Sequence, residues 1–409
     1  MDYRSLLSRV YALGPRGIEL GLDRVRAAAD AIGAPDRSLR CVQIAGTNGK
    51  GAVAVLVEGG ARASGLSTGL FTSPHLHRYS ERFRVNGAEI DEAELAPHLA
   101  RALSLTVPPS NLPLTFFEVT TVAAFGLFAE RRVELAVLEV GLGGRLDATT
   151  VAAPEVTAIT SIGLDHTDLL GPTLRHVARE KAGVARPGVP LVVGPLPDEA
   201  LAEVERAAAA VGAPLVCYGR DFAWDDGLSL SWPGRHQREN AAVARAVCDA
   251  LGRTDPRLTR SAFARAAAEA VWPGRYEEIP GRPKHVLDGA HNVEAMACLI
   301  AALAERGQRV DAVLFGACGD KPIRAMLDLL EPLGCPLVLA PPPLARAFDP
   351  SAHAARRNAS AAPDIASGLA RCRGLAPPGG AVLVTGSLFT VAEARRILLG
   401  VRADMPIGL

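Results

Sequence analysis

The sequence has 409 residues, of which 49% are hydrophobic, so it is long enough for two or three domains with buried cores. Lysine plus arginine and aspartate plus glutamate number 44 each, and this balance gives no electrostatic case for nucleic acid or an anionic membrane as the main partner. The seven cysteines are scattered, which argues against a zinc site or a disulfide framework and for a reducing compartment. We expect a cytoplasmic protein, because the first residues lack a signal-peptide core and no charge-free apolar run reaches the about 18 residues of a membrane span.

Short apolar runs alternate with alanine-rich helical patterns over the first part of the chain. Four runs are typical of buried strands: 41–46, 134–141, 155–163 and 190–194. Three patterns are typical of helices: 50–65, 120–132 and 239–252. This alternation predicts a parallel sheet with helices on both faces, and ligands of such sheets gather at the carboxyl ends of the strands.

A segment rich in proline and glycine, 271–285, separates this alternation from a second one. The second alternation has the length of one typical small domain. We therefore predict an α/β fold with a larger parallel-sheet domain over 1–277 and a smaller Rossmann-like α/β domain over 278–409. Within the second domain, residues 341–364 are expected to form a long surface loop and a helix.

Residues 44–52, IAGTNGKGA, have the composition of a phosphate-binding loop between a strand and a helix. The glycines let backbone N–H groups face an anion, the start of the helix adds its positive end, and Lys50 supplies a charge for the outer phosphates. Compared with the common P-loop, the first glycine comes two residues late, and Gly51 stands where serine or threonine usually follows the lysine. An ordinary glycine turn with a surface lysine is the simpler alternative. The strand–turn–helix context favours a nucleotide site formed by Gly46, Thr47, Asn48, Gly49, Lys50 and Gly51.

Since Gly51 has no side chain to bind a metal, the metal ligands must come from elsewhere. Ser73 in FTSPHL, Glu139 in LEVGLGGRLD and His166 in LDHTD all stand at the ends of predicted strands. Magnesium prefers oxygen ligands, and a lone glutamate in an apolar strand is costly to bury without a cation or another partner. Each residue also fits a structural role when it is taken alone. Their shared placement at one edge of the sheet favours a magnesium site.

Lys181, in AREKAGVARPG, follows a helical pattern and would ordinarily be a solvated lysine. A buried lysine can instead lose its proton and become nucleophilic toward carbon dioxide. The spacing of the residues around Lys181 does not decide between these two states.

These motifs, in this order, resemble the folylpolyglutamate synthase/dihydrofolate synthase family, within the wider group of muramyl-peptide ligases. The likeness spans nearly the whole chain and rests on AGTNGKG, FTSPHL, FFEVTT, EVGLGGRLDAT, LDHTDLLG, REKAG, HQRENA, WPGR, DGAHN and TGSLF. It implies a P-loop-containing ATP-binding domain over 1–277 and a glutamate-ligase domain over 278–409. It also implies a cytoplasmic monomer that uses ATP and Mg²⁺ to join L-glutamate to dihydropteroate or to reduced folates through an acyl phosphate.

The resemblance assigns roles to the matching positions of this chain. It implies that Ser73, Glu139 and His166 bind Mg²⁺ and that Lys181 is carbamylated. The implied catalytic residues are Lys50, His166 and Lys181. ATP contacts beyond the loop map to Asn240, Arg275, Asp288 and His291, which implies that ATP binds between the two domains. Contacts on the pterin side map to Leu20, Gly21, Leu22, Thr115, Phe116, Phe117, Glu118, Leu146, Asp147 and Ala148.

Two positions depart from the family pattern. Ala52 stands where serine or threonine is usual, and Thr150 stands where asparagine usually follows DAT. We expect these departures to alter affinity without abolishing activity. The segments GGRLDAT and LDHTDLLG favour a bifunctional enzyme over one that only extends polyglutamate.

Three other functions fit parts of the sequence. A UDP-muramyl-peptide ligase shares the reaction logic but usually has an extra N-terminal domain, for which there is no room before residue 46. A P-loop GTPase switch fits poorly with the shortened loop and the second α/β domain. A non-catalytic nucleotide-binding protein, suggested by Ala52, fits poorly with the presence of Lys50, Glu139, His166 and Asp288.

Overall fold

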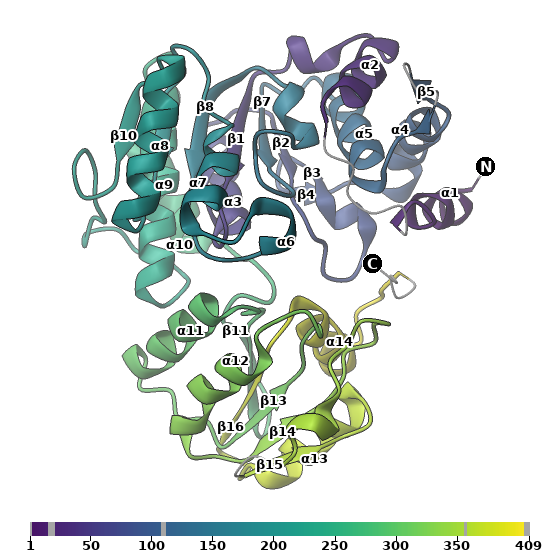
Figure 1. The fold of residues 1–409 in the computed structure, drawn as a ribbon, viewed down its shortest axis with the longest axis vertical. Helices are drawn as coiled ribbons and strands as arrows, with labels where there is room; N and C mark the ends of the chain where they lie inside the picture. Colours follow the sequence, from purple (N-terminus) through teal and green to yellow (C-terminus); the bar gives the residue numbers. More distant parts are fainter. Residues whose placement is uncertain (1, 15–20, 108–111, 356–357, 405–409) are drawn as a thin grey trace. The chain divides into compact units, whose positions relative to one another are not determined.

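The structure is a computed structural model that describes residues 2–14, 21–107, 112–355 and 358–404 (Figure 1). The chain divides into two compact units. Unit 1 consists of Met1–His75, Tyr79–Ser231 and Gln237–Ala270, and unit 2 consists of Leu76–Arg78, Trp232–His236 and Val271–Leu409. The main segment of unit 2 therefore begins ahead of residue 277. Within the described part of the chain, no helix is both long and apolar enough to cross a membrane.

Among the described residues, unit 1 is built on an eight-stranded sheet with the order β10-β9-β8-β1-β7-β2-β3-β4. From β10 to β2 in this order, neighbouring strands are parallel. At the other edge of the sheet, β3 and β4 add antiparallel pairs. The strands are β1 (Cys41–Ala45), β2 (Thr68–Phe71), β3 (Phe83–Val85), β4 (Ala88–Glu89), β7 (Leu135–Glu139), β8 (Pro154–Ile159), β9 (Leu191–Val193) and β10 (Leu215–Cys217). A separate antiparallel pair is formed by β5 (Thr106–Val107) and β6 (Leu112–Pro113).

Helices cover both faces of this sheet, which explains why every residue of β1 and β7 is buried. Side chains alternate along a strand, so Cys41 and Ala45 point to the same face of β1. That face packs against α1, α2, α4 and α5 over one half of the sheet and against α7 and α8 over the other half. Helix α3 covers the opposite face and contacts α10, where a Cβ on Gly60 would lie 3.0 Å from the ring of Phe263.

Along the chain, the helices of unit 1 alternate with its strands (Figure 1). Their bounds are α1 (Tyr3–Tyr11), α2 (Asp23–Ala31), α3 (Lys50–Ala63), α4 (Glu92–Leu103), α5 (Phe116–Glu130), α6 (Thr167–Leu170), α7 (Leu174–Ala182), α8 (Asp198–Val211), α9 (Arg235–Leu251) and α10 (Arg260–Glu269). Short 3₁₀ helices occupy Pro35–Arg37, Tyr79–Arg82 and Ala148–Val151. The predicted strands and helices of this region are confirmed, with ends that differ by a few residues from those expected.

Unit 2 has a six-stranded sheet in its described residues, with the order β11-β12-β16-β13-β14-β15. All its pairs are parallel except that of β11 with β12. The strands are β11 (Glu277–Ile279), β12 (Lys284–Leu287), β13 (Ala312–Phe315), β14 (Leu337–Leu339), β15 (Ala359–Ala361) and β16 (Ala381–Thr385). The helices are α11 (Val293–Glu305), α12 (Ile323–Leu330), α13 (Ile365–Leu375) and α14 (Leu388–Leu399), with 3₁₀ helices at Glu331–Leu333 and Pro350–His353.

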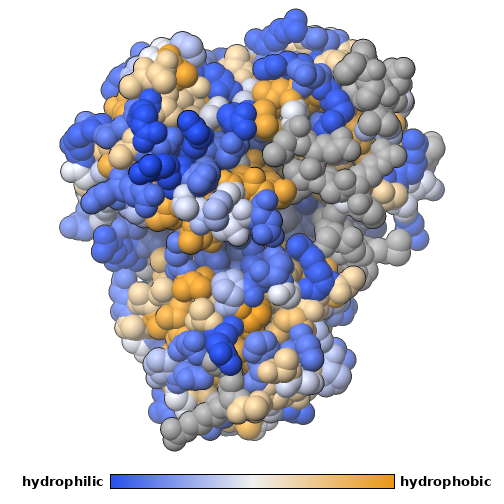
Figure 2. Space-filling model, in the orientation of Figure 1, coloured by the Kyte–Doolittle hydropathy of each residue, from blue (hydrophilic) through white to orange (hydrophobic). Residues whose placement is uncertain are grey.

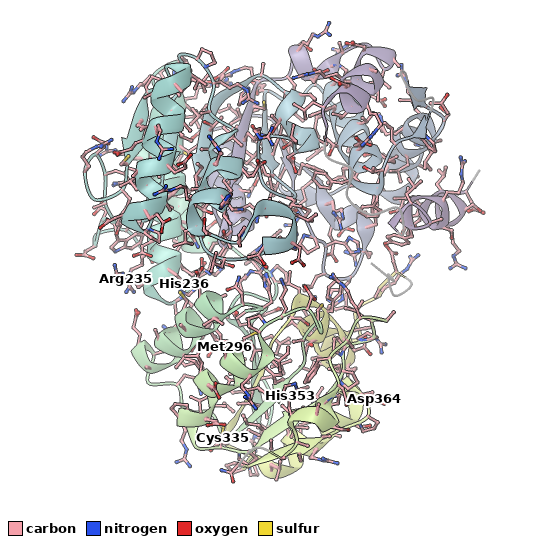
Figure 3. All side chains as sticks on the ribbon, viewed as in Figure 1. Arg235, His236, Met296, Cys335, His353 and Asp364 are labelled. Carbon is pink, nitrogen blue, oxygen red and sulfur yellow. The ribbon has the colours of Figure 1, made fainter. Side chains whose placement is uncertain are left out.

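Two hydrophobic clusters lie on the two faces of the unit 2 sheet. One cluster joins the sheet to α11 and α12 and contains Met296, which is fully buried and is labelled in Figure 3. The other cluster joins the sheet to α13 and α14. The second α/β unit predicted from the sequence is therefore confirmed as a sheet covered on both faces.

The segment 341–364 differs from its expected form. In place of the expected longer helix, its described residues form the 3₁₀ helix Pro350–His353 and the strand β15. Leu337 of β14 pairs with Ala359, so β15 obtains its backbone hydrogen bonds by extending the sheet. This pairing partner is distant in sequence, and no local pattern indicates it.

Candidate nucleotide and metal site

The phosphate loop joins β1 to α3, and close contacts require two of its glycines. Gly46 has a φ of 149°, and a Cβ on it would overlap the hydroxyl oxygen of Thr160. Gly49 directly precedes α3 with a φ of 86°, and a Cβ on it would overlap the side-chain oxygen of Asn240. A side chain at either position would displace the loop. Gly51 lies inside α3 and is not part of the loop.

The loop after β8 holds the phosphate loop in place. The N–H of Thr47 donates to the carbonyl oxygen of Ser161 at 2.8 Å, and the N–H of Asn48 donates to Oγ of Ser161 at 2.9 Å. Oγ1 of Thr160 donates to the carbonyl oxygen of Asn48 at 2.6 Å. Two loop amides are therefore committed to the protein, and the N–H groups in the first turn of α3 are those that helix geometry leaves to face a phosphate. The hydroxyls of Thr160 and Ser161 in ITSIG are the sequence signal for this support.

Two lysines converge on the phosphate loop from different helices. Nζ of Lys50 donates to the carbonyl oxygen of Thr47 at 3.2 Å. Nζ of Lys181, near the end of α7, donates to the carbonyl oxygen of Gly46 at 2.8 Å. Lys181 is only 4% exposed, so the solvated state that its helical pattern suggested is wrong. Burial, with the nearby positive charge of Lys50 as a second cause, lowers the pKa of Lys181 to about 7.

Ser73 and Glu139, two of the three predicted metal ligands, meet in the structure. Glu139 is the last residue of β7 and is 4% exposed. Its Oε2 accepts a hydrogen bond of 2.9 Å from the N–H of Ser73, which follows β2. Because β7 pairs with both β1 and β2, this contact lies at the same sheet edge as the phosphate loop. A buried carboxylate and a hydroxyl are donors that suit Mg²⁺.

His166, the third predicted ligand, lies in the loop after β8, where it precedes α6 with a φ of 51°. The residue is exposed, and its N–H donates to Oδ1 of Asp165 at 3.0 Å. Strand β8 is the other neighbour of β1, so this loop leaves the sheet at the same edge as Glu139. Groups of three or more His, Cys, Asp or Glu residues that could hold a metal are absent from the described chain. The predicted ligand set contains only two residues of those types, Glu139 and His166, together with Ser73.

Asp147, predicted on the pterin side, has a buried carboxylate that organises its own loop. Oδ2 accepts from the N–H groups of Gly141 and Leu142 at 2.9 and 3.0 Å, and Oδ1 accepts from the N–H and the hydroxyl of Thr149 at 3.0 and 2.6 Å. Burial raises the pKa of Asp147 despite these hydrogen bonds. Leu146 is partly exposed beside it, and Ala148 is buried at the start of a 3₁₀ helix.

The two departures from the family pattern occupy buried positions. Ala52 lies in α3 with 4% exposure. Oγ1 of Thr150 accepts from the side-chain amide of Gln43 at 2.7 Å and donates to the carbonyl oxygen of Gly144 at 2.6 Å. Thr150 therefore supports the fold of the loop between β7 and β8.

The start of α5 contains four of the predicted pterin-side residues. Oγ1 of Thr115 accepts from the N–H of Glu118 at 3.3 Å, and Oε2 of Glu118 accepts from the N–H of Thr115 at 2.8 Å, which completes a capping box. Glu118 also pairs with Arg24 at 3.0 Å. Phe116 and Phe117 are partly exposed and follow the cap. Gly21 and Leu22 precede α2, and Leu20 lies outside the described residues.

A buried arginine beside Phe116 was missed from the sequence. The guanidinium carbon of Arg82 lies 5.2 Å from the ring centre of Phe116 and 5.7 Å from that of Tyr79. Nε of Arg82 donates to Nδ1 of His75 at 2.8 Å. Arg82 is 3% exposed, and burial lowers its pKa. Its position depends on the chain reversal between β2 and β3, which has no clear sequence signal.

In unit 2, Arg275, Asp288 and His291 occur in one small region at the end of β12. Oδ1 and Oδ2 of Asp288 accept from the N–H groups of Ala290 and Tyr276 at 2.9 and 2.8 Å. Nδ1 of His291 and the carbonyl oxygen of Gly289 are 2.9 Å apart. A Cβ on Gly289 would lie 2.6 Å from Nη1 of Arg275, so this glycine gives the guanidinium its space. Asn240 belongs to unit 1, next to Gly49.

Comparisons with known proteins identify the family. Residues 274–388 match the family described as "Mur ligase, glutamate ligase domain". The dihydrofolate synthase/folylpolyglutamate synthase of Bacillus subtilis is 31% identical over 97% of this chain and 99% of its own length. A probable bifunctional folylpolyglutamate synthase/dihydropteroate synthase of Haloferax volcanii is 34% identical over 97% of this chain, which spans about half the length of that relative (50%).

A solved structure matches the fold of the whole chain. The bifunctional folylpolyglutamate synthase/dihydrofolate synthase of Yersinia pestis, complexed with AMPPNP and Mn ion, is similar to this protein with a TM-score of 0.86 and 32% identity. The match covers 97% of this chain and 98% of that chain. The resemblance and the α/β fold class indicated by the sequence motifs are thereby confirmed. The chain belongs to the folylpolyglutamate synthase/dihydrofolate synthase family.

Proposed function

We propose that this chain is an ATP-dependent amide-forming ligase that joins L-glutamate to dihydropteroate and to reduced folates. The observation that supports this most strongly is the arrangement at one sheet edge of unit 1. There the phosphate loop, two converging lysines and the Ser73–Glu139 contact follow adjacent strands. The family likeness supplies the reaction class.

The proposed reaction solves a problem of leaving groups. A carboxylate is unreactive toward an amine because oxide would have to leave. In the first step, a carboxylate oxygen of the pterin substrate attacks the γ-phosphorus of ATP, and ADP leaves. In the second step, the unprotonated amine of L-glutamate attacks the acyl carbon, and inorganic phosphate departs with the oxygen that formed the bridge.

In the first step, the protein would mainly position the reactants and neutralise the negative charge of the phosphates. The first-turn amides of α3 and Lys50 would bind the outer phosphates, and Asn240 stands against the turn at Gly49. Because Thr160 and Ser161 fix the loop, these donors need little rearrangement when ATP binds. We assign Arg275, Asp288 and His291 to further ATP contacts, as the family motifs imply.

The donor set at the sheet edge fits a divalent cation. Ser73, Glu139 and His166 would hold Mg²⁺, which would neutralise phosphate charge during transfer. The support is the Glu139 carboxylate, buried at a strand end and hydrogen-bonded to the N–H of Ser73.

We further propose that Lys181 is carbamylated. Its pKa of about 7 leaves a substantial neutral fraction at neutral pH. The neutral amine would attack carbon dioxide through its lone pair and release one proton, which converts a cation into an anion. The product would relieve the repulsion between Lys181 and Lys50.

On the pterin side we assign Gly21, Leu22, Thr115, Phe116, Phe117, Glu118, Leu146, Asp147 and Ala148 to substrate binding, with Leu20 outside the described residues. Phe116 and Phe117 are partly exposed and supply apolar surface for a flat heterocycle, and Arg82 covers the ring of Phe116. Thr115, Glu118 and Asp147 are committed to caps and turns, so we expect them to shape the site by fixing its backbone.

A substrate panel tests the function. ADP release should be measured with Mg-ATP and L-glutamate, together with dihydropteroate, a reduced folate or a UDP-muramyl peptide. We expect release with both pterin substrates and its loss in Glu139→Gln. Release with the reduced folate alone would establish a polyglutamate-only enzyme, and release with the muramyl peptide alone would contradict the proposal. Normal turnover by Glu139→Gln would refute the metal assignment.

We also infer a cytoplasmic monomer that works without nucleic acid or a membrane. The zero formal net charge and the seven free cysteines support this inference. Light scattering of the purified chain measures the oligomeric state, and a dimer mass would contradict it.

A further inference from the structure

A pocket of about 410 Å³ in unit 1 lies apart from the nucleotide site. Its wall includes Pro154, which begins β8, and Val189, which precedes β9. These residues stand at the amino ends of parallel strands, whereas the phosphate loop follows the carboxyl end of β1. None of the predicted nucleotide or metal residues lines this pocket, and Leu22 is the one lining residue shared with the assigned pterin-side positions.

Three arginines line this pocket: Arg26, Arg145 and Arg186. Aspartate and glutamate are absent from its described lining. We call it the arginine pocket. Figure 2 shows hydrophilic and hydrophobic residues interspersed over one face of the molecule.

The arginine side chains keep N–H groups available. Nε and Nη2 of Arg145 donate to Oε1 of Glu180 at 3.1 and 2.9 Å, which leaves Nη1 uncommitted. Arg186 donates through Nη1 and Nη2 to the carbonyl oxygens of Gly183, Ala185 and Thr150, at 3.0, 3.0 and 2.9 Å, and its Nε is uncommitted. Arg26 has one long ion pair, 4.0 Å to Asp23.

The backbone around the pocket holds Arg186 and Arg145 in fixed positions. Arg186 is anchored by three carbonyl oxygens, and among the described residues no carboxylate lies within ion-pair distance of it. A Cβ on Gly183 would lie 2.5 Å from the Cα of Arg145, so only glycine lets the chain at Arg145 pack against the end of α7. Burial lowers the pKa of Arg186, and the charge of Arg26 adds to this effect. The two cations therefore repel each other across the pocket, and an anion would relieve that repulsion.

We propose that the arginine pocket binds a small, multiply charged anion at a site separate from the nucleotide site. Arg145 and Arg186 each offer one uncommitted nitrogen, Nη1 and Nε respectively, and Arg26 adds a guanidinium with only one long ion pair. Three guanidinium groups suit a ligand with two or more negative charges. The volume is that of a small-molecule site. Leu22, Val151 and Pro154 give it an apolar part, which suits the carbon portion of an organic anion.

Calorimetric titration of the full chain tests this proposal. Pyrophosphate represents phosphate ligands, and γ-linked triglutamate represents polycarboxylates. The titration uses metal-free protein with Lys50→Ala, which weakens anion binding at the phosphate loop. We expect at least one probe to bind, more weakly as salt rises. The probe that binds more tightly shows whether the pocket prefers a phosphate or a polycarboxylate ligand.

Matched variants separate the pocket from general surface charge. Arg26→Gln should weaken binding about tenfold, and Arg145→Gln should do so to a similar extent. Arg175→Gln is the control, because Arg175 is similarly exposed and has a similarly long ion pair, 3.9 Å to Glu199. Thermal unfolding verifies that Arg145→Gln remains folded, and Arg26→Gln alone decides if it does not.

Three results would overturn the proposal. The first is no binding of either probe at millimolar concentration. The second is equal affinity in the Arg26→Gln protein, the Arg175→Gln protein and their parent. The third is displacement of the bound anion by dihydropteroate, which would make the pocket part of the substrate site. Activity of the enzyme is not measured in this test, so its outcome is independent of the proposed ligase function.

Discussion

Two lysines at the phosphate loop have different surroundings. Lys50 begins α3 and is partly exposed, whereas Lys181 is 4% exposed and donates to the carbonyl oxygen of Gly46. Water stabilises the charged form of a lysine, so burial weakens the hold of Lys181 on its proton. The neutral form of Lys181 is the one that would react with carbon dioxide in the proposed carbamylation.

The lowered pKa of Lys181 predicts a pH dependence of stability. Its pKa is about 7 in the folded state and near its ordinary value of 10.5 when unfolded, so the unfolded chain binds more protons between these values. The free energy of unfolding of the parent should therefore rise relative to that of Lys181→Met from about pH 7 to about pH 10.5. Urea unfolding of both proteins in CO₂-free buffer measures the difference. A difference that stays constant across this range would contradict the burial argument.

Substitution of two glycines that have the same φ distinguishes the cost of backbone strain from the cost of steric overlap. Gly49 and Gly65 both have a φ of 86°, but a Cβ on Gly49 would overlap Asn240, whereas Gly65 has open space around it. Gly65→Ala should cost about 1 kcal/mol of unfolding free energy from strain alone. Gly49→Ala should cost about 1–3 kcal/mol more and abolish ADP binding, because the loop must shift. Chemical denaturation and nucleotide titration compare the two variants, and equal effects would contradict the proposed role of the Gly49–Asn240 contact.

At the scale of elements, α5 is determined partly by its local sequence and partly by its tertiary packing. Its capping box can be recognised in the sequence, because Thr115 is followed three positions later by Glu118. Ten of its residues are buried because it packs between the sheet and α2 and α4. Its sequence is apolar on all sides, which is typical of a buried helix, but no local pattern identifies its packing partners. The cap fixes where the helix begins, and Phe116 and Phe117 are placed as a consequence.

The capping role of Thr115 predicts how its substitution changes the stability of the protein and the binding of substrate. Thr115→Ala should lower the free energy of unfolding by about 1 kcal/mol, because the N–H of Glu118 loses its acceptor, and Thr115→Ser should restore it. If Thr115 acts through the cap, the KM for dihydropteroate should follow the same pattern. An unchanged stability in Thr115→Ala, or a raised KM in Thr115→Ser at normal stability, would show that Thr115 acts by direct contact.

Much of the alternation of strands and helices was predictable because apolar runs and helical patterns are local features of the sequence. The strands 41–46 and 134–141 predicted from sequence correspond closely to β1 and β7. What could not be predicted depends on partners distant in sequence: the addition of β15 to β14, the burial of Lys181, and the position of Arg82 over Phe116. The site was predictable as a set of strand ends, but its hydrogen bonds were not.

At the scale of the whole molecule, each unit has its own hydrophobic clusters. Met296→Ala removes a fully buried side chain from unit 2 and should cost about 2–5 kcal/mol. Hydrogen exchange should accelerate in β13 and β16 and stay unchanged in β1 and β7, because local opening follows local packing. Equal acceleration in both units, read by mass spectrometry of peptides, would show that they unfold as one.

The central claim is that the carboxyl group of a pterin substrate is activated by phosphorylation. Dihydropteroate labelled with ¹⁸O in its carboxylate tests this claim during turnover with Mg-ATP and L-glutamate. The account predicts that each released phosphate contains one ¹⁸O atom, because the oxygen that attacks the γ-phosphorus leaves with it. Phosphate free of the label, with product still formed, would contradict the account.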